Sequence, residues 1–308
     1  MAKLAPRSEN DMLIAIREAV EGTVLITTQT KQSLDEISLI HALGGEDTSR
    51  RSRSGHSLLV VSATGTGKST LIDVYCDNAA PELRYKMITV VPGQPAKSPQ
   101  IIVDMLATLD DDEPLAGSTH EREERCFKLL KDREIELIFF DELHQFTSSG
   151  SKKDVNTRGG HWLKTFMDRS CCPLIGFATE EVFELLGHHH ELASRFPNPI
   201  AYDPFCWDLK ERRNDFFVFL RALEKSVDPL RAKGVLTDPR VAAEVHAETQ
   251  GRARLVKHAV IGSATLAVRN GLPALTPEMV ITAAKATGLK ALRDGVLRKG
   301  GRKGKKTE

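Results

Sequence analysis

The chain has 308 residues, of which 41% are hydrophobic and 28% are charged, and its formal net charge is +1. This is ordinary for a globular protein with room for one large α/β domain and a smaller appendage. The sequence excludes a membrane-spanning protein, because no apolar run approaches the length of a membrane span. Its five cysteines include no CxxC pair, which indicates reduced thiols in the cytoplasm rather than a disulfide framework or a zinc site.

The first part of the chain, residues 1–54, is predicted to be an N-terminal helical extension followed by a linker. Apolar residues recur at helical spacing in residues 11–21 and 31–43, which favours two helices. The pair Gly44-Gly45 would end the second helix, and the polar residues 46–56 would form the linker.

Residues 57–70 contain the most informative motif of the sequence. An apolar run rich in β-branched residues is followed by small residues and glycines, then by Lys68, Ser69 and the start of a helix. Strand, glycine loop and helix in this order are the context that a phosphate-binding P-loop requires. The residues expected to bind the phosphates of ATP are Ser62, Ala63, Thr64, Gly65, Thr66, Gly67, Lys68, Ser69 and Thr70.

Each part of this loop has a physical role. Gly65 and Gly67 let the backbone curl with its N–H groups pointing inward, and the new helix adds its free N–H groups and the positive end of its dipole. Lys68 would reach the β and γ phosphates, and the Ser69 hydroxyl would hold Mg²⁺. The pattern departs from G-x-x-x-x-G-K-[ST] at one position, because Ser62 stands where the first glycine is expected; serine is small enough to begin the loop.

Further strands are predicted at residues 86–91, 136–142 and 172–179, with helices at 101–109, 119–133 and 162–168 and a flexible loop at 147–160. Strands that alternate with helices indicate a parallel sheet, so residues 55–206 are predicted to form an α/β nucleotide-binding core. From about residue 207 the pattern becomes entirely helical, which predicts an α-helical lid over residues 207–290.

The last residues, 291–308, are predicted to be a basic, disordered tail. Residues 298–308 hold six Lys and Arg against one acid, which leaves a charge of −4 for the rest of the chain. Such a tail could bind phosphate backbone without sequence preference, or it could dock on a protein partner.

Two carboxylates, Asp141 and Glu142, end the predicted apolar strand at 136–142. The carboxyl end of a parallel strand is where α/β proteins place ligands. With the P-loop upstream, we expect Asp141 to orient Mg²⁺ and Glu142 to polarise the water that attacks the γ-phosphate. Thr179 ends the following strand and would lie beside the γ-phosphate; the alternative is a hydroxyl that satisfies the strand terminus.

Two arginines complete the predicted site. Arg195 follows the next helix and could reach the nucleotide of a neighbouring subunit, with a structural, salt-bridged arginine as the alternative. Arg254 begins a helix of the lid and could fold back onto the phosphates; Arg252 is its rival for that role.

Taken together, GTGKST, LIFFDE followed by Leu143-His144, the strand that ends in Thr179, ELASRF and the GRAR of the helical lid resemble an AAA+ ATPase. The Asp-Glu-Leu-His stretch and the compact length are similar to the TniB/TnsC family of transposition regulators. The resemblance covers about residues 30–285 and implies an AAA+ P-loop NTPase core with a helical lid, in a bacterial cytoplasmic protein. It implies ATP-dependent assembly of a ring or helical filament on duplex DNA, which recruits a DDE transposase and a target-selector protein. His144 would support or pack against the carboxylates and would not serve as a base.

The resemblance also points to DNA-binding residues. Related AAA+ assemblies face their central pore with the positions of Lys97 and Arg122, and Lys152 and Lys153 are further candidates. From the sequence alone each of these is more often a solvated surface charge.

Two other functions fit the same residues. One is an AAA+ activity of the helicase-loading or replication-initiation type, in which a protein is remodelled. The other is a nucleotide-binding scaffold with negligible turnover.

Overall fold

The computed structural model describes residues 8–45, 57–92, 98–147, 154–170 and 172–288. Contacts between Cα atoms divide the chain into two compact units, one formed by Thr28–Tyr202 and the other by Met1–Thr27 together with Asp203–Glu308. The expected N-terminal extension, residues 1–54, is therefore shared between the two units.

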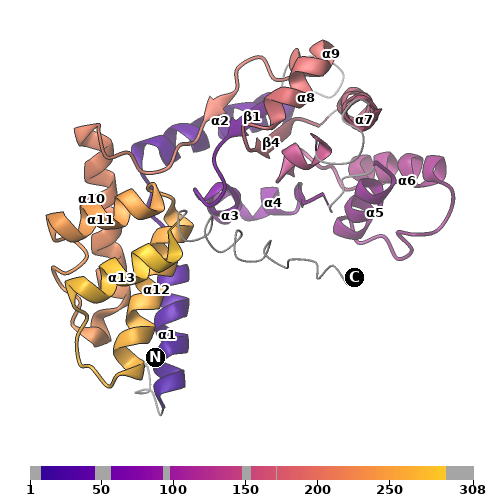
Figure 1. Ribbon diagram of the computed structural model, residues 1–308. Coiled ribbons are helices and arrows are strands. Elements are labelled where there is room, and N and C mark those ends of the chain that lie inside the picture. The colour runs from indigo at the N-terminus through magenta and orange to yellow at the C-terminus, as the bar shows by residue number, and fades with distance from the viewer. Residues whose placement is uncertain (1–7, 46–56, 93–97, 148–153, 171, 289–308) are drawn as a thin grey trace, which may run out of the picture. The chain divides into compact units, whose positions relative to one another are not determined.

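The unit Thr28–Tyr202 is built on a parallel sheet with the strand order β2-β3-β4-β1-β5 (Figure 1). Its strands are β1 (Ser57–Val61), β2 (Met87–Val90), β3 (Leu137–Phe140), β4 (Leu174–Ala178) and β5 (Ile200–Ala201). The register pairs Val61 with Ala178 and Ala201, so the carboxyl ends of β1, β4 and β5 lie at one edge of the sheet. Phe140 pairs with Gly176, which places the end of β3 near the same edge.

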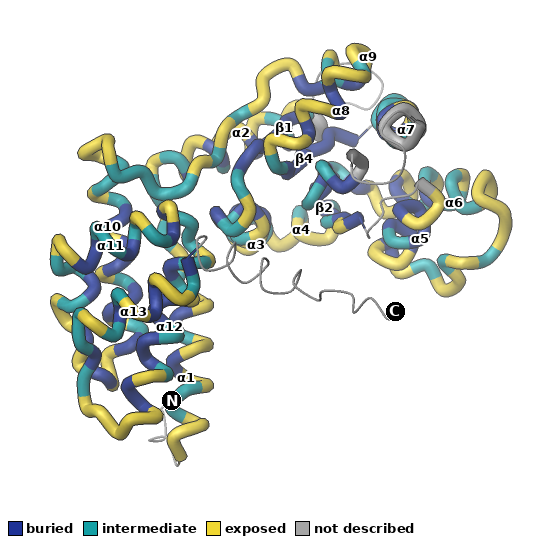
Figure 2. Tube along the Cα trace, viewed as in Figure 1, coloured by how far each residue is buried: buried dark blue, intermediate teal, exposed yellow. Residues whose placement is uncertain are grey.

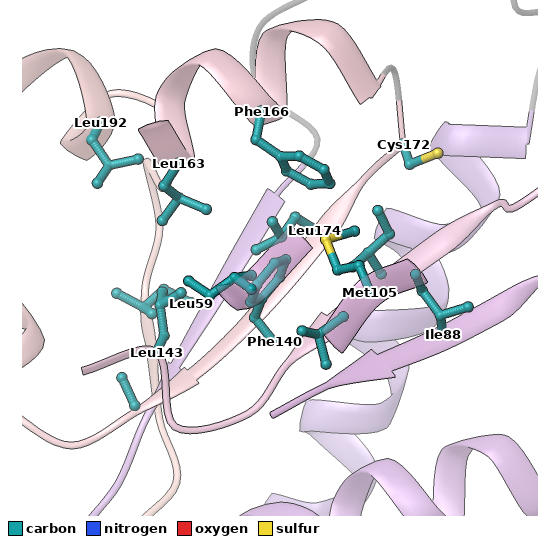
Figure 3. Packing of buried hydrophobic residues seen from close by; sticks show 14 of the residues in the cluster. Leu59, Ile88, Met105, Phe140, Leu143, Leu163, Phe166, Cys172, Leu174 and Leu192 are labelled. Carbon is teal, nitrogen blue, oxygen red and sulfur yellow. The ribbon is translucent and has the colours of Figure 1, made fainter. Parts of the chain in front are cut away.

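Helices cover both faces of the sheet, because alternate residues of each buried strand point to opposite sides. One face packs against α5 (Ser98–Thr108), α6 (Thr119–Asp132), α7 (Asp154–Ser170) and α8 (Val182–His188). The other face packs against α2 (Thr28–Gly45) and α3 (Lys68–Asn78). Figure 3 shows the first face, where Leu59, Phe140 and Leu174 come from neighbouring strands and Phe166 of α7 packs on Phe140 with ring centroids 6.0 Å apart.

The helix α7 begins earlier than the sequence predicts. Residues 154–160 were expected to lie in a loop, but they form its first two turns. Gly160, one of the residues that suggested a loop, has a packing role, since a Cβ at this position would clash with the ring of His189. The short elements α4 (Pro81–Arg84), α9 (His190–Ala193) and a 3₁₀ helix at Leu143–Thr147 complete this unit.

The buried imidazole of His41 connects α2 with α3 and with Glu136, the residue before β3. The Nδ1 atom of His41 lies 2.9 Å from the hydroxyl of Tyr75, and its Nε2 atom lies 3.5 Å from a carboxylate oxygen of Glu136. Burial lowers the pKa of His41, and the Glu136 carboxylate opposes this shift only in part.

In its described residues the second unit contains helices and no strand, as predicted for the lid, but it also contains the helix α1. Its helices are α1 (Glu9–Glu21), α10 (Lys210–Ser226), α11 (Pro239–Thr249), α12 (Ala253–Arg269) and α13 (Pro277–Thr287), with a 3₁₀ turn at Asp228–Leu230. Ile16 and Val20 of α1 are buried in the same core as Phe216 of α10 and Val260 of α12. Figure 2 shows this pattern as a buried side on each helix and exposed residues on the other.

A tight contact fixes the start of α12. Gly251 has φ +65°, and its carbonyl accepts a hydrogen bond from the N–H of Phe205 at 3.0 Å. Only glycine fits, because a Cβ at this position would lie 2.0 Å from the carbonyl oxygen of Phe205. None of the helices in the described ranges combines the length and the apolar character that a membrane crossing requires.

Candidate functional site

The predicted P-loop joins the end of β1 to the first turn of α3. The N–H of Ser62 continues the sheet by donating to the carbonyl of Ala178 at 2.9 Å. Gly65 and Gly67 then adopt positive φ angles of 82° and 112°, and α3 begins at Lys68. The loop therefore curls in front of a helix N-terminus, where unpaired N–H groups and the helix dipole attract an anion.

Side chains inside the loop brace it. Lys68 is only 5% exposed, and its Nζ donates to the carbonyl oxygens of Ser62 at 3.2 Å and Ala63 at 3.3 Å. The hydroxyls of Ser62 and Thr66 are hydrogen-bonded to each other, and Thr66 also donates to the carbonyl of Ala63 at 2.9 Å. The serine that replaces the usual first glycine is thus accommodated, with its hydroxyl satisfied inside the loop.

Ser69 and Asp141, the two residues that the sequence predicts for a metal site, are in contact at the end of β3. The Ser69 hydroxyl donates to Oδ2 of Asp141 at 2.7 Å, and Oδ1 of the same carboxylate accepts the N–H of Glu142 at 2.9 Å. Asp141 is only 6% exposed. A hydroxyl and one carboxylate in contact fit Mg²⁺, which prefers oxygen ligands and takes the rest of its shell from water and substrate phosphates.

Glu142 has an uncommon backbone conformation. Its φ angle is +54°, in the left-handed region that costs a non-glycine residue on the order of 1 kcal/mol or more. Its carboxylate lies 3.2 Å from Nε2 of His144, and Nδ1 of His144 accepts a long hydrogen bond of 3.4 Å from the N–H of Thr179. The Thr179 hydroxyl points to the Glu181 carboxylate at 3.4 Å. The two predicted residues Glu142 and Thr179 are therefore joined through His144. The sequence predicted that His144 supports the carboxylates, but it did not reveal the contact with Thr179.

Arg195 forms an ion pair within its own chain. Its Nη2 atom lies 2.7 Å from Oδ1 of Asp168 in α7, and its side chain is 17% exposed. This is the structural contact that the sequence left open as the alternative to a role at a neighbouring subunit. An action of Arg195 on a neighbour's nucleotide stays a prediction.

The structure gives no contact with phosphates or DNA for the remaining predicted residues among those that it describes. Arg254 is exposed in the first turn of α12, in the helical unit, and Arg252 is the N-cap of that helix. Arg122 is partly exposed in the first turn of α6, where its Nη2 atom lies 3.4 Å from the Thr119 hydroxyl. Lys97, Lys152, Lys153 and the basic tail fall outside the described residues. Contact of any of these with phosphates or DNA stays a prediction.

Residues 20–203 match the family model described as "Bacterial TniB protein". The chain belongs to the TniB family. This confirms the resemblance found in the sequence, and the parallel five-stranded sheet flanked by helices confirms the AAA+ core of this TniB-family chain.

Solved structures support the fold of this TniB chain. It is similar to the ORC1 protein of Aeropyrum pernix in complex with DNA, with a TM-score of 0.60 and 19% identity over 87% of this chain and 68% of that one. The ORC2 protein of the same organism, in ADPNP and ADP complexes, gives a TM-score of 0.63 with 11% identity over 90% of this chain and 74% of that one. Drosophila ORC bound to DNA gives a TM-score of 0.55 with 14% identity over 92% and 68% of the two chains.

Among curated proteins, the ATP-dependent Clp protease ATP-binding subunit ClpE of Streptococcus pneumoniae is 22% identical over 151 residues. The match spans 49% of the TniB chain but only 19% of ClpE. At these identities the relatives and neighbours show the fold of the chain.

Proposed function

We propose that this TniB-family chain is an ATPase that binds ATP and Mg²⁺ at the loop 62–70 and uses hydrolysis as a switch for assembly on duplex DNA. The observation that carries the proposal is the 2.7 Å contact between Ser69 and Asp141, formed beside the buried Lys68 at the N-terminus of α3. A glycine loop, a lysine, a hydroxyl and a carboxylate in this arrangement match the needs of a triphosphate with its metal.

The roles of the residues follow from their positions. The N–H groups of the loop and of the first turn of α3 would bind the phosphate oxygens, and Lys68 would exchange its bonds to the carbonyls of Ser62 and Ala63 for bonds to phosphate. Ser69 and Asp141 would hold Mg²⁺, which supplies charge neutralisation at the β and γ phosphates. Glu142 would accept a proton from the attacking water, and Thr179 would lie near the leaving phosphate.

The family and the DNA-bound ORC neighbours support the second half of the proposal. ATP held between subunits would favour a ring or helical filament in which Arg195 completes the neighbour's site. The assembly would mark duplex DNA of arbitrary sequence as a target for transposition, recruit a DDE transposase and receive a target-selector protein. Hydrolysis would release subunits and reset the choice of target.

The test compares three variants for binding of a fluorescent ATP analogue and for electron microscopy with ATP and duplex DNA. Lys68→Ala should lose nucleotide binding and assembly, because it removes the buried cation of the loop. Glu142→Gln should bind ATP, keep only a low residual rate of hydrolysis and stabilise the DNA-bound oligomers. Lys31→Ala, an exposed lysine of α2, is the matched control and should behave as the wild type. Isolated wild-type monomers with ATP and DNA would refute the proposal.

A second candidate is an ATPase of the helicase-loading or replication-initiation type, which the ORC-like fold favours. Such a protein would need a helicase partner and would show little coating of DNA that grows with DNA length. A nucleotide-binding scaffold, in contrast, would bind ATP normally and would be unaffected by Glu142→Gln.

A further inference from the structure

The side chain of His144 connects Glu142 with Thr179, a residue that lies 35 positions after His144 in the sequence. On one side its Nδ1 atom accepts the N–H of Thr179, the residue that follows β4, at 3.4 Å. On the other side its Nε2 atom lies 3.2 Å from Oε2 of Glu142. The ring is largely enclosed, with 14% of its side chain exposed, whereas the Glu142 side chain is 31% exposed.

The partners of the ring determine its tautomer. A backbone N–H can only donate, so Nδ1 of His144 must be the unprotonated nitrogen. The neutral ring then carries its proton on Nε2 and donates it to the Glu142 carboxylate. The imidazole therefore accepts a hydrogen bond from the main chain of Thr179, directly after β4, and donates one to the proposed base Glu142.

The main chain of Glu142 is itself held in place by hydrogen bonds to its neighbours. Its left-handed φ of +54° is unfavourable for a glutamate and persists only where surrounding bonds impose it. Asp141 accepts the N–H of Glu142 at 2.9 Å, and the carbonyl of Glu142 accepts the N–H of Gln145 at 2.9 Å. These bonds fix the main chain, and the ring of His144 fixes the carboxylate.

We propose that His144 is a positioning residue that holds the Glu142 carboxylate in line by anchoring it to the main chain at Thr179. The inference rests on the proposed ATPase function and deepens it. A base that is oriented by a third group loses rate when that group is removed, even though the base itself remains. The two contacts described above join His144 to Glu142 and to Thr179, so its removal is expected to act on hydrolysis rather than on nucleotide binding.

The kinetic test uses the full chain with ATP, with and without duplex DNA. His144→Ala should lower kcat about 10- to 100-fold, the usual effect of removing a supporting partner, with little change in the affinity for a fluorescent ATP analogue. His144→Gln should recover much of the rate, because its amide N–H can replace Nε2. His144→Asn reaches only the Nδ1 position and should not recover it. His120→Ala, on an imidazole whose side chain is 78% exposed, is the matched control.

Two further measurements separate positioning from general damage. In the Glu142→Gln background, His144→Ala should cost nothing more, because residues that act as a unit are non-additive. NMR of ¹⁵N-labelled histidine should find the His144 proton on Nε2, and this arm needs no enzymatic activity. A proton on Nδ1, unchanged hydrolysis in His144→Ala, or a full additional loss in the double variant would overturn the inference.

The rate of ATP hydrolysis by the wild type distinguishes a failure of the proposed function from a failure of the positioning role of His144. A wild-type chain that hydrolyses no ATP under any of these conditions would refute the proposed function and the positioning role with it. A wild-type chain that hydrolyses ATP beside an equally active His144→Ala would refute the positioning role alone.

Discussion

Gly176 offers a direct test of how the sheet supports the site. It lies in β4 opposite Leu59 and Phe140, and a Cβ added to it would lie 2.8 Å from Cδ2 of Leu143 and 3.3 Å from Cδ1 of Leu59. Leu143 is fully buried, so it has no open space into which it can turn. Overpacking a core by one methyl group costs about 1–3 kcal/mol, and replacing a glycine returns roughly 0.4–1 kcal/mol through the unfolded chain.

Gly176→Ala should therefore destabilise the α/β unit by roughly 1–2 kcal/mol and lower its Tm by about 2–8 °C. Leu143 stands between Glu142 and His144, so its displacement should also lower the rate of ATP hydrolysis. The matched control is Gly187→Ala in α8, where a new Cβ meets nothing within 4 Å; it should be neutral or slightly stabilising. Calorimetry in which both variants melt alike, or in which Gly176→Ala melts at or above the wild type, would refute the reasoning.

Three other predictions follow from contacts in the two units. Gly251→Ala should lower the Tm of the helical unit much more than Gly271→Ala, because both have positive φ but only the first clashes with a carbonyl; equal shifts in calorimetry would contradict this. Burial lowers the pKa of His41, so the unfolded chain binds its proton more tightly and the free energy of unfolding should fall as the pH drops below about 6.5. Urea titrations over that range should show a smaller fall in His41→Gln, and an identical fall would argue against the buried neutral ring. Burial also raises the pKa of Cys126 to about 12, so iodoacetamide should label this thiol only on unfolding, and rapid labelling of the native protein, detected by mass spectrometry, would show the opposite.

Much of the α/β unit could be predicted from the sequence because its signals are local. The glycine loop follows its strand directly, and Asp141 ends an apolar run that could only be a buried strand. The meeting of Ser69 with Asp141 could be expected from the rule that parallel strands bring their carboxyl ends to one edge. Local patterns therefore located the loop, the hydroxyl and the carboxylate.

The contacts that the sequence did not reveal are those between distant residues or within very short elements. The strand β5 has two residues, too few for a periodic pattern, and exists because β1 offers it hydrogen-bond partners. The pairing of Arg195 with Asp168 and the bridge from His144 to Thr179 depend on how helices and strands pack, which no spacing encodes. The first turns of α7 were mistaken for a loop because Gly160 is favoured there by a close neighbour, not by a turn.

The place of α1 in the helical unit bears on the order in which the protein is assembled. During synthesis α1 leaves the ribosome before the α/β unit, yet the buried core that contains Ile16 and Val20 also includes residues of α12, which emerges more than 200 residues later. The α/β unit can fold before α12 is synthesised, because its strands and helices are contiguous in the chain. During that time the apolar side of α1 remains exposed to solvent. A truncation that removes residues 1–27 would therefore remove α1 and expose the apolar core of the helical unit to water.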